Sequence, residues 1–96
     1  MAASPSNAAD TDVLRDKFAF NWLTLSSKTK CAKISAKLLA EFGSKRYRCN
    51  LEGVTNTASG GKAQTCRRTD DRFEYLIFDT LAACEEERKT QASNED

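Results

Sequence analysis

Four cysteines are the residues of this chain best suited to chemistry, and their spacing limits which chemistry they can do. They are Cys31, Cys49, Cys66 and Cys84, separated by 18, 17 and 18 positions in a chain of 96 residues. A zinc site usually takes its ligands from close C-x-x-C-like pairs, and thioredoxin-type redox chemistry requires such a pair, but none occurs here. An even number of cysteines in so short a chain favours two structural disulfides. Four buried thiols in a cytosolic core are the alternative, and zinc is the least favoured explanation.

No other group of side chains forms a catalytic, metal or cofactor motif. The chain has no histidine, the usual general base near neutral pH. The neighbouring carboxylates Asp70-Asp71 and residues 85–87 are expected at a turn and on a solvated helix face, without the burial that acid catalysis requires. The run Gly60-Gly61-Lys62 lacks the further glycine and the helix of a phosphate loop. We therefore predict a protein that is not an enzyme and that binds neither metal nor cofactor.

Charge is unevenly distributed, although the net charge is only +1. Residues 28–49 contain seven basic residues against one acid, whereas residues 69–96 contain three basic residues against nine acids. A basic surface of this kind suits an acidic protein or a polyanion, while two oppositely charged elements that complement each other are the simpler explanation. The predicted binding face consists of Lys30, Lys33, Lys37, Arg46, Arg48 and Lys62.

Length and composition indicate one small domain of ordinary soluble composition. We predict a disordered tail over residues 1–11, a single α+β domain over residues 12–91 and a frayed tail over residues 92–96. The longest apolar runs, residues 75–78 and 81–84, are far shorter than the roughly 20 residues that span a bilayer. No membrane span is therefore expected.

The N-terminal segment of this domain has two interpretations. Leu14, Phe18 and Trp22 fall at four-residue spacing, which favours a helix face. Phe18, Phe20 and Trp22 also alternate, which favours an extended segment. We predict a short helical turn over residues 13–17, followed by an irregular stretch that lays its aromatic side chains on the core.

A helix is predicted over residues 26–42. Ser26 or Ser27 can cap it, and Gly43 suits a left-handed exit. One buried stripe is expected from apolar residues at spacings of three and four, namely Cys31, Ile34, Leu38, Leu39 and Phe42.

From residue 45 the apolar pattern changes to a period of two, which predicts a strand. Tyr47, Cys49 and Leu51 are expected on one side of this strand, opposite its arginines. A polar, mobile loop over residues 53–62 follows. The remaining predicted elements are a strand over residues 63–68, a tight turn over 69–71, a strand over 72–78, and a helix from residue 81 to about 91 that Asp79 or Thr80 caps.

This order predicts a two-layer α+β sandwich: a helix, a three-stranded antiparallel meander, and a second helix, with both helices on the apolar face of the sheet. Two disulfides would join the layers. Pairing each helix with its neighbouring strand gives the favoured connectivity, Cys31–Cys49 with Cys66–Cys84. The rival connectivity, Cys49–Cys66 with Cys31–Cys84, follows if the long hairpin sets its two cysteines opposite each other.

Two functional hypotheses remain. The first is a small secreted or periplasmic interaction module without catalytic activity, which binds another protein through its basic face or the loop over residues 53–62. It assumes that a signal peptide has been removed, because the residues after Met1 do not resemble one. The alternative is a cytosolic nucleic-acid-binding or regulatory domain with reduced cysteines that uses the basic residues 28–48. Nucleic acid is the less expected partner, and nothing in the sequence indicates the oligomeric state.

Overall fold

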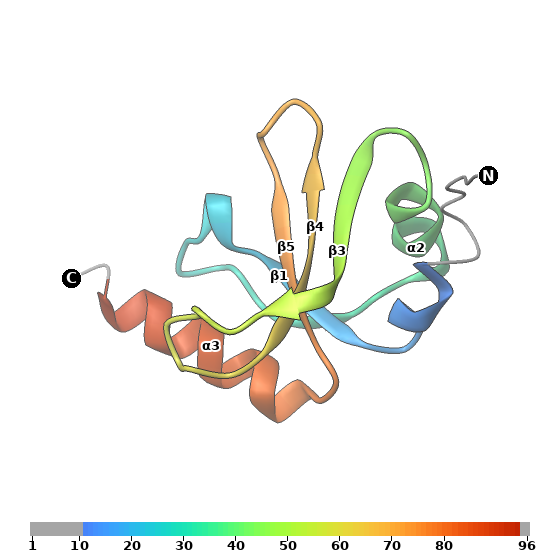
Figure 1. Cartoon of the computed structure of the whole chain (residues 1–96). Helices are drawn as coiled ribbons and strands as arrows, with labels where there is room; N and C mark the ends of the chain where they lie inside the picture. Colours follow the sequence, from blue (N-terminus) through green and yellow to red (C-terminus); the bar gives the residue numbers. More distant parts are fainter. Residues whose placement is uncertain (1–10, 95–96) are drawn as a thin grey trace.

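The computed structural model describes residues 11–94, which form one sheet with helices packed against it (Figure 1). In chain order the elements are the 3₁₀ helix η1 (Thr11–Leu14), β1 (Phe18–Asn21), the 3₁₀ helix η2 (Trp22–Thr24), β2 (Ala32–Lys33), α2 (Ala36–Phe42), β3 (Tyr47–Val54), β4 (Ala63–Arg68), β5 (Glu74–Phe78) and α3 (Leu81–Asn94). Within these residues the fold is α+β, with two α-helices and a five-stranded antiparallel sheet of strand order β2-β1-β5-β4-β3. The predicted class is confirmed, but the sheet is larger than the predicted three strands. Of the predicted N-terminal tail, residues 1–10 lie outside the described part of the chain.

The predicted meander is present as β3, β4 and β5. β4 has the predicted bounds, and Tyr47 and Cys49 of β3 turn away from the exposed Arg48 between them. β5 begins at Glu74, later than the predicted start at residue 72, because the backbone of Asp71, at φ 64°, extends the turn. α3 begins as predicted and continues to Asn94, past the predicted end at residue 91.

The predicted irregular stretch after residue 17 is a strand, β1. It pairs with β5 in the register Phe18 opposite Phe78 and Phe20 opposite Leu76. The alternation of aromatic residues was therefore the informative pattern in this segment. The predicted helical turn over residues 13–17 is also displaced, because η1 ends at Leu14 and Asp16, at φ 65°, turns the chain into the strand.

The long helix predicted over residues 26–42 is wrong in its first half. Ser26 and Thr29 bond each other's backbone, with the Ser26 N–H donating to Thr29 Oγ1 (2.8 Å) and the Thr29 N–H donating to the Ser26 carbonyl (3.1 Å). Such local bonds give the backbone an alternative to helix. The helix begins only at Ala36, where the N-cap Ser35 accepts a bond from the Leu38 N–H (3.0 Å).

That helix, α2, does end at Phe42 as predicted. Gly43 follows it at φ −83°, in the right-handed region, so the predicted left-handed exit is also wrong. Ser44 caps the C-terminus of the helix instead: its hydroxyl donates to the Glu41 carbonyl over 2.6 Å, which satisfies a carbonyl of the last turn.

The two helices lie on opposite faces of the sheet, so the predicted two-layer arrangement is wrong. Along β5, Ile77 packs with Phe42 of α2, whereas Leu76 and Phe78 pack with Cys84 of α3. Because successive residues of a strand point to opposite faces, α2 and α3 must cover different sides. The continuous apolar run of β5 indicates a strand buried on both faces.

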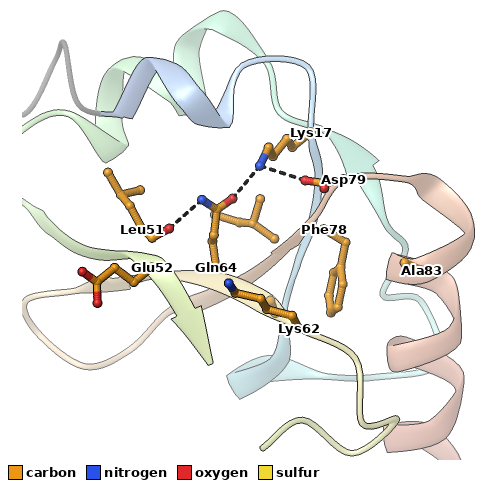
Figure 2. Close-up of a pocket in the computed structure, with 10 residues that line it drawn as sticks. Lys17, Leu51, Glu52, Lys62, Gln64, Phe78, Asp79 and Ala83 are labelled. Carbon is orange, nitrogen blue, oxygen red and sulfur yellow. Dashed lines mark hydrogen bonds and ion pairs between the residues drawn. The ribbon is translucent and has the colours of Figure 1, made fainter. Parts of the chain in front are cut away.

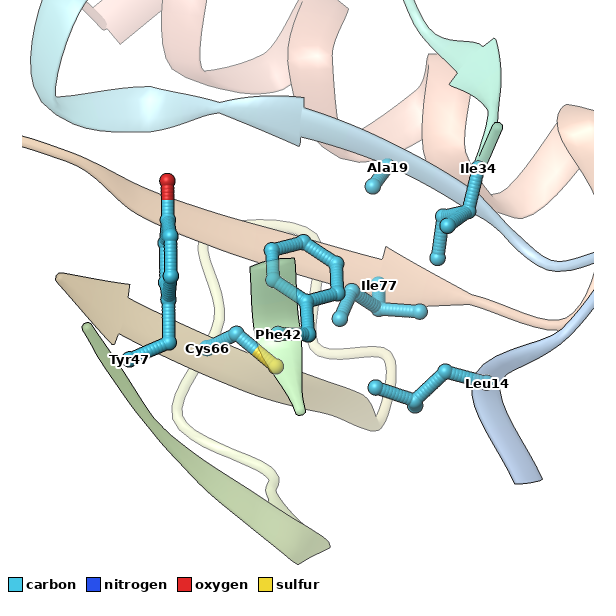
Figure 3. Packing of buried hydrophobic residues seen from close by; sticks show 7 residues of the cluster. All are labelled: Leu14, Ala19, Ile34, Phe42, Tyr47, Cys66 and Ile77. Atoms are coloured by element: carbon cyan, nitrogen blue, oxygen red, sulfur yellow. The ribbon is translucent and has the colours of Figure 1, made fainter. Parts of the chain in front are cut away.

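The face covered by α2, hereafter the α2 face, is built around Phe42 (Figure 3). The Phe42 ring meets the Tyr47 ring edge-on at 5.1 Å between centroids and the Tyr75 ring at 5.4 Å. Leu14 and Ile34 close this cluster from η1 and from the end of β2. The face is therefore held by aromatic and aliphatic packing.

The face covered by α3, hereafter the α3 face, has a smaller apolar core. Its buried members are Phe20, Ala63, Leu76, Phe78 and Cys84. Only Cys84 of these belongs to the helix, and Leu81 in its first turn is 48% exposed. The apolar content of α3 cannot by itself position this helix.

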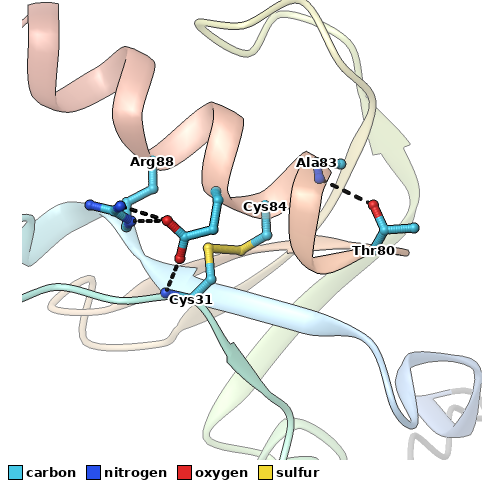
Figure 4. The surroundings of a disulfide bond; sticks show 6 residues. Cys31, Thr80, Ala83, Cys84 and Arg88 are labelled. Atoms are coloured by element: carbon cyan, nitrogen blue, oxygen red, sulfur yellow. Dashed lines mark hydrogen bonds and ion pairs between the residues drawn. A yellow bond between two sulfur atoms is a disulfide. The ribbon is translucent and has the colours of Figure 1, made fainter.

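The disulfides are Cys49–Cys66 and Cys31–Cys84, so the favoured pairing is wrong and the rival is correct. Cys49 and Cys66 stand directly opposite each other in the β3–β4 ladder, with 4.0 Å between their Cα atoms. Cys31 lies in the chain before β2, not on a helix beside β3, and there it meets Cys84 in the first turn of α3 (Figure 4). The error follows from the wrong helix assignment, which placed Cys31 near the opposite edge of the sheet.

Candidate functional site

An open groove crosses the α2 face above β1, with a volume of about 540 Å³. We call it the β1 groove. Its apolar lining comes from Ala19, Leu38, Phe73 and Tyr75, and its charged lining consists of Lys30 and Lys33. No carboxylate is among its lining residues.

The aromatic side chains of the β1 groove are fixed by contacts outside it. Tyr75 packs against Phe42, and burial raises the pKa of its phenol, so the hydroxyl stays neutral and able to donate. Arg68 lies over the Phe73 ring at 4.5 Å from its centroid. The same guanidinium and the Arg72 N–H hold the pKa of Asp70 at about 2.

The predicted basic face is divided by the structure. Lys30 and Lys33 come together at the β2 edge, and Lys37 lies nearby in sequence on α2 without lining the groove. Arg46 and Arg48 belong to the β3 region at the other edge of the sheet. The sixth residue, Lys62, lines a different cavity.

That second cavity, of about 280 Å³, lies near the start of α3 (Figure 2). The Lys17 ammonium donates to Gln64 Oε1 and pairs with Asp79, both at 2.8 Å, while the Gln64 amide donates to the Leu51 carbonyl at 2.8 Å. These contacts join β4 to β3 and to the chain leading into α3. Lys17 is committed to them, so this cavity serves to connect elements.

A third cavity lies on the α3 face, where η2, the loop after β3 and the end of α3 meet over the sheet. We call it the Trp22 cleft; its volume is about 370 Å³. The Trp22 indole is 37% exposed and its Nε1–H donates to Glu74 Oε1 over 2.9 Å. Arg67 also approaches that oxygen, at 3.3 Å.

Glu87 of α3 fixes the wall of the Trp22 cleft. Its carboxylate accepts from the backbone N–H groups of Ala58 (3.0 Å) and Ser59 (2.8 Å) and from the Gln91 amide (2.6 Å). Burial alone would raise the pKa of Glu87, but these hydrogen bonds outweigh it, and the pKa lies below the ordinary glutamate value.

The expectation that residues 85–87 are solvated is therefore wrong for Glu87, which is 0% exposed. Glu85 is also engaged, because it accepts from the Cys31 N–H (3.3 Å) and pairs with Arg88, which lowers its pKa (Figure 4). The carboxylates of Asp70 and Asp71 are exposed as expected, and they pair with Arg68 and Arg67.

Gly53 is required where β3 turns into this loop. Its φ is +92°, and a side chain there would place a Cβ 2.9 Å from the Ala63 carbonyl oxygen. The strand bulges at this point, between Asn50 and Val54, and Asn50 accepts from the Gly53 N–H over 3.1 Å.

Trp22 and Glu87 were missed as site residues by the sequence analysis. The alternation of Phe18, Phe20 and Trp22 could have indicated that Trp22 continues a strand face. Helical spacing puts Glu87, three residues after Cys84, on the same face of α3, but its residue type gives no indication of burial.

The comparisons with known proteins give no relative. No family model matches the chain, and neither a curated protein nor a solved structure matches it. None of the helices in residues 11–94 has the length and apolar content that crossing a bilayer requires. In the same residues, no group of three or more His, Cys, Asp or Glu side chains is arranged to hold a metal ion.

Proposed function

We propose that this chain is a secreted or periplasmic protein-interaction module, without catalytic activity, that binds an acidic segment of its partner in the β1 groove. The observation that carries the proposal is the lining of the groove: two lysines, no carboxylate and an aromatic, apolar base. Within residues 11–94, neither Lys30 nor Lys33 forms an ion pair.

Charge complementarity supports an acidic partner. Two exposed lysines in a lining that contains no carboxylate create a positive potential that favours association with carboxylates. Leu38, Phe73 and Tyr75 add apolar area, which supplies more of the affinity than exposed ion pairs do. The partner segment should therefore combine Asp or Glu with an apolar side chain.

A protein partner is favoured over a polyanion such as nucleic acid. Phosphate backbones are bound by lysines and arginines that follow a continuous track. Here Arg46 and Arg48 belong to the opposite edge of the sheet from Lys30 and Lys33. The two disulfides also support an oxidising compartment, where such bonds persist, rather than the cytosol.

The absence of catalytic activity is part of the proposal, and it is supported by the lack of two groups that often act in catalysis, a histidine general base and a free thiol nucleophile. The chain has no histidine, and all four cysteines are in disulfides, which leaves no thiol nucleophile. Its buried carboxylate, Glu87, is ionised and occupied by three donors, the opposite of a carboxyl tuned to give up a proton.

The test is selection from a random 12-residue displayed peptide library against the oxidised protein. We expect enriched peptides to carry net negative charge and an apolar residue. Their affinity should fall about tenfold or more in the double variant Lys30→Glu with Lys33→Glu, because both charges are reversed. The matched control, Lys62→Glu with Lys89→Glu, makes the same charge change on exposed residues outside the groove and should leave affinity within about twofold at moderate salt.

Two results would contradict the proposal. One is a failed selection: the enriched peptides are neutral or basic, or they bind the groove variant and the control variant with equal affinity. The other is retention on heparin that exceeds peptide binding and falls steeply with salt, which would instead favour the polyanion hypothesis.

A further inference from the structure

The Trp22 cleft is independent of the β1 groove, because it opens on the other face of the sheet. Thr65 and Leu76 form its base, and both alternate with residues of the α2 face along their strands. Its volume of about 370 Å³ falls in the range of small-molecule sites, about 300–1,000 Å³. A ligand could occupy it without touching Lys30 or Lys33.

The exposed indole offers a ligand its ring surface. The Nε1–H of Trp22 is already used by Glu74, so the part left for a ligand is the carbon face of the ring. An indole exposed to 37% at the mouth of a cavity is exposed apolar area, which marks recognition sites more often than it serves stability.

The polar groups of the cleft are almost all neutral. Asn56, Thr65 and Gln91 provide amides and a hydroxyl, which both donate and accept, and Thr57, whose hydroxyl donates to the Gly61 carbonyl over 2.5 Å, adds an acceptor. The Nε2 amide of Gln91 donates to Glu87, so the Oε1 of Gln91 remains as an acceptor. Glu74 is the one charged residue of the lining, and its Oε1 accepts from Trp22 and pairs with Arg67.

The wall of the cleft is fixed before any ligand arrives. The carboxylate of Glu87 holds the N–H groups of Ala58 and Ser59, and the Gly60 N–H closes a turn onto the Thr57 carbonyl at 3.1 Å. Binding therefore requires little ordering of the loop, and fewer contacts suffice for measurable affinity.

We propose that the Trp22 cleft binds a neutral sugar residue of a glycan, with the C–H face of the sugar ring on the indole and its hydroxyls hydrogen-bonded to the amides and hydroxyls of the lining. An apolar ring surface beside neutral donors and acceptors matches this chemistry. The lining has no basic side chain to recognise a phosphate or a sulfate, and its one carboxylate, that of Glu74, already pairs with Arg67. The inference does not depend on the proposed protein partner.

The chain reports on this site by itself, since Trp22 is its only tryptophan. The experiment is to titrate the oxidised full chain with neutral oligosaccharides of glucose, galactose, mannose and N-acetylhexosamine, and to follow the tryptophan emission. We expect a saturable change with at least one of these sugars, and an unchanged sugar affinity when an acidic peptide selected for the β1 groove is already bound.

Variants locate the binding by calorimetry. Trp22→Ala removes the stacking surface and should weaken binding about tenfold or more. Asn56→Ala changes an exposed loop amide, with little risk to folding, and should weaken it several-fold. The matched control Val13→Ala removes another exposed apolar side chain, 55% exposed, on η1, which contacts α2 and does not line the cleft, and should bind as the original chain does.

The inference is overturned if no neutral oligosaccharide in the set changes the emission up to millimolar concentrations. It is also overturned if binding survives unchanged in both Trp22→Ala and Asn56→Ala. An acidic peptide that competes with the sugar for the cleft would assign the cleft to the protein partner and likewise overturn the sugar proposal. Loss of sugar binding would leave the β1 groove test untouched, so the two proposals fail separately.

Discussion

The two faces of the sheet are covered by helices that are held in different ways. α2 is only seven residues long, yet it places Phe42 at the centre of an aromatic cluster with Tyr47 and Tyr75. α3 has 14 residues and contributes one buried apolar side chain, Cys84, which is covalently linked to Cys31. α2 is thus held by packing, whereas α3 is held by a disulfide and a buried carboxylate.

This difference teaches that a helix can be positioned by a few strong contacts when it lacks an apolar stripe. Glu87 takes a buried place that a leucine or isoleucine would take in an amphipathic helix. Its charge is acceptable there because three donors satisfy it. The contrast predicts different sensitivities for the two faces, in the following order of expected size.

Phe42→Ala should have the largest effect. Phe42 is 1% exposed and contacts two aromatic rings, so its removal leaves a cavity that the disulfides cannot fill. We expect a loss of about 3–5 kcal/mol in the free energy of unfolding, measured by urea denaturation of the oxidised protein.

Leu81→Ala is the matched change on the other helix. Leu81 is 48% exposed, and we expect its loss to change the free energy of unfolding by no more than about 0.5 kcal/mol. Equal losses for the two substitutions would remove the distinction between the faces.

Removing the Cys31–Cys84 bridge, as Cys31→Ser with Cys84→Ser, should come next. The sequence separation of 53 gives a loss of about 4 kcal/mol in the loop-entropy description. Hydrogen exchange should show that the amides of α3 lose protection first, because the bridge is the main link of this helix to the sheet.

The other bridge provides the control. For Cys49→Ser with Cys66→Ser, the separation of 17 predicts a loss of about 3 kcal/mol, with α3 still protected. If α3 stays protected in the first double variant as well, packing rather than the bridge positions it, and the comparison fails.

Glu87→Gln should have a smaller effect than Phe42→Ala or the loss of either bridge, about 1–3 kcal/mol. The new amide can accept one backbone N–H but presents a donor to the other, so one group loses its bond. Because the pKa of Glu87 is lowered in the folded protein, its contribution is complete above the ordinary glutamate pKa of about 4.3 and is lost as the pH falls through the lower, folded value.

The measurement is the free energy of unfolding from pH 7 down to pH 2 for the original chain, Glu87→Gln and Glu86→Gln. Asp70 and Glu85 also have lowered pKa values, so all three proteins should lose stability in acid. The original chain and Glu87→Gln should converge as the pH falls, whereas Glu86→Gln should follow the original chain throughout. A constant difference at every pH would show that the charge of Glu87 is not what holds the loop.

The C-terminal half of the fold could be predicted from the sequence. The period of two around Cys49, the turn at residues 69–71 and the Thr80 cap are local signals, and the structure uses each of them. The N-terminal half could not be predicted in the same way. The apolar residues from Cys31 to Phe42 are spaced as on a helix, but Cys31 and Ile34 lie before and after a two-residue strand whose partner, β1, belongs to a separate segment earlier in the chain. Spacing within a segment does not reveal such pairing.

The candidate sites show the same limit. Lys30 and Lys33 were named from charge alone, and the structure places them on a groove. Their neighbours Phe73 and Tyr75 come from a hairpin that is remote in sequence. The Trp22 cleft combines side chains from η2, β3, β4, β5 and α3, so it exists only once the sheet order is known.

The bridges are nested, because the loop from Cys49 to Cys66 lies wholly inside the loop from Cys31 to Cys84. A pulling force applied at the two ends of the chain therefore passes directly from residue 31 to residue 84 through one covalent link. The segments outside that link can be stretched, whereas the backbone between Cys31 and Cys84, which contains β3, β4 and β5, cannot be extended. The outer bridge would therefore have to be reduced before the chain could pass through a pore that admits only a single extended polypeptide.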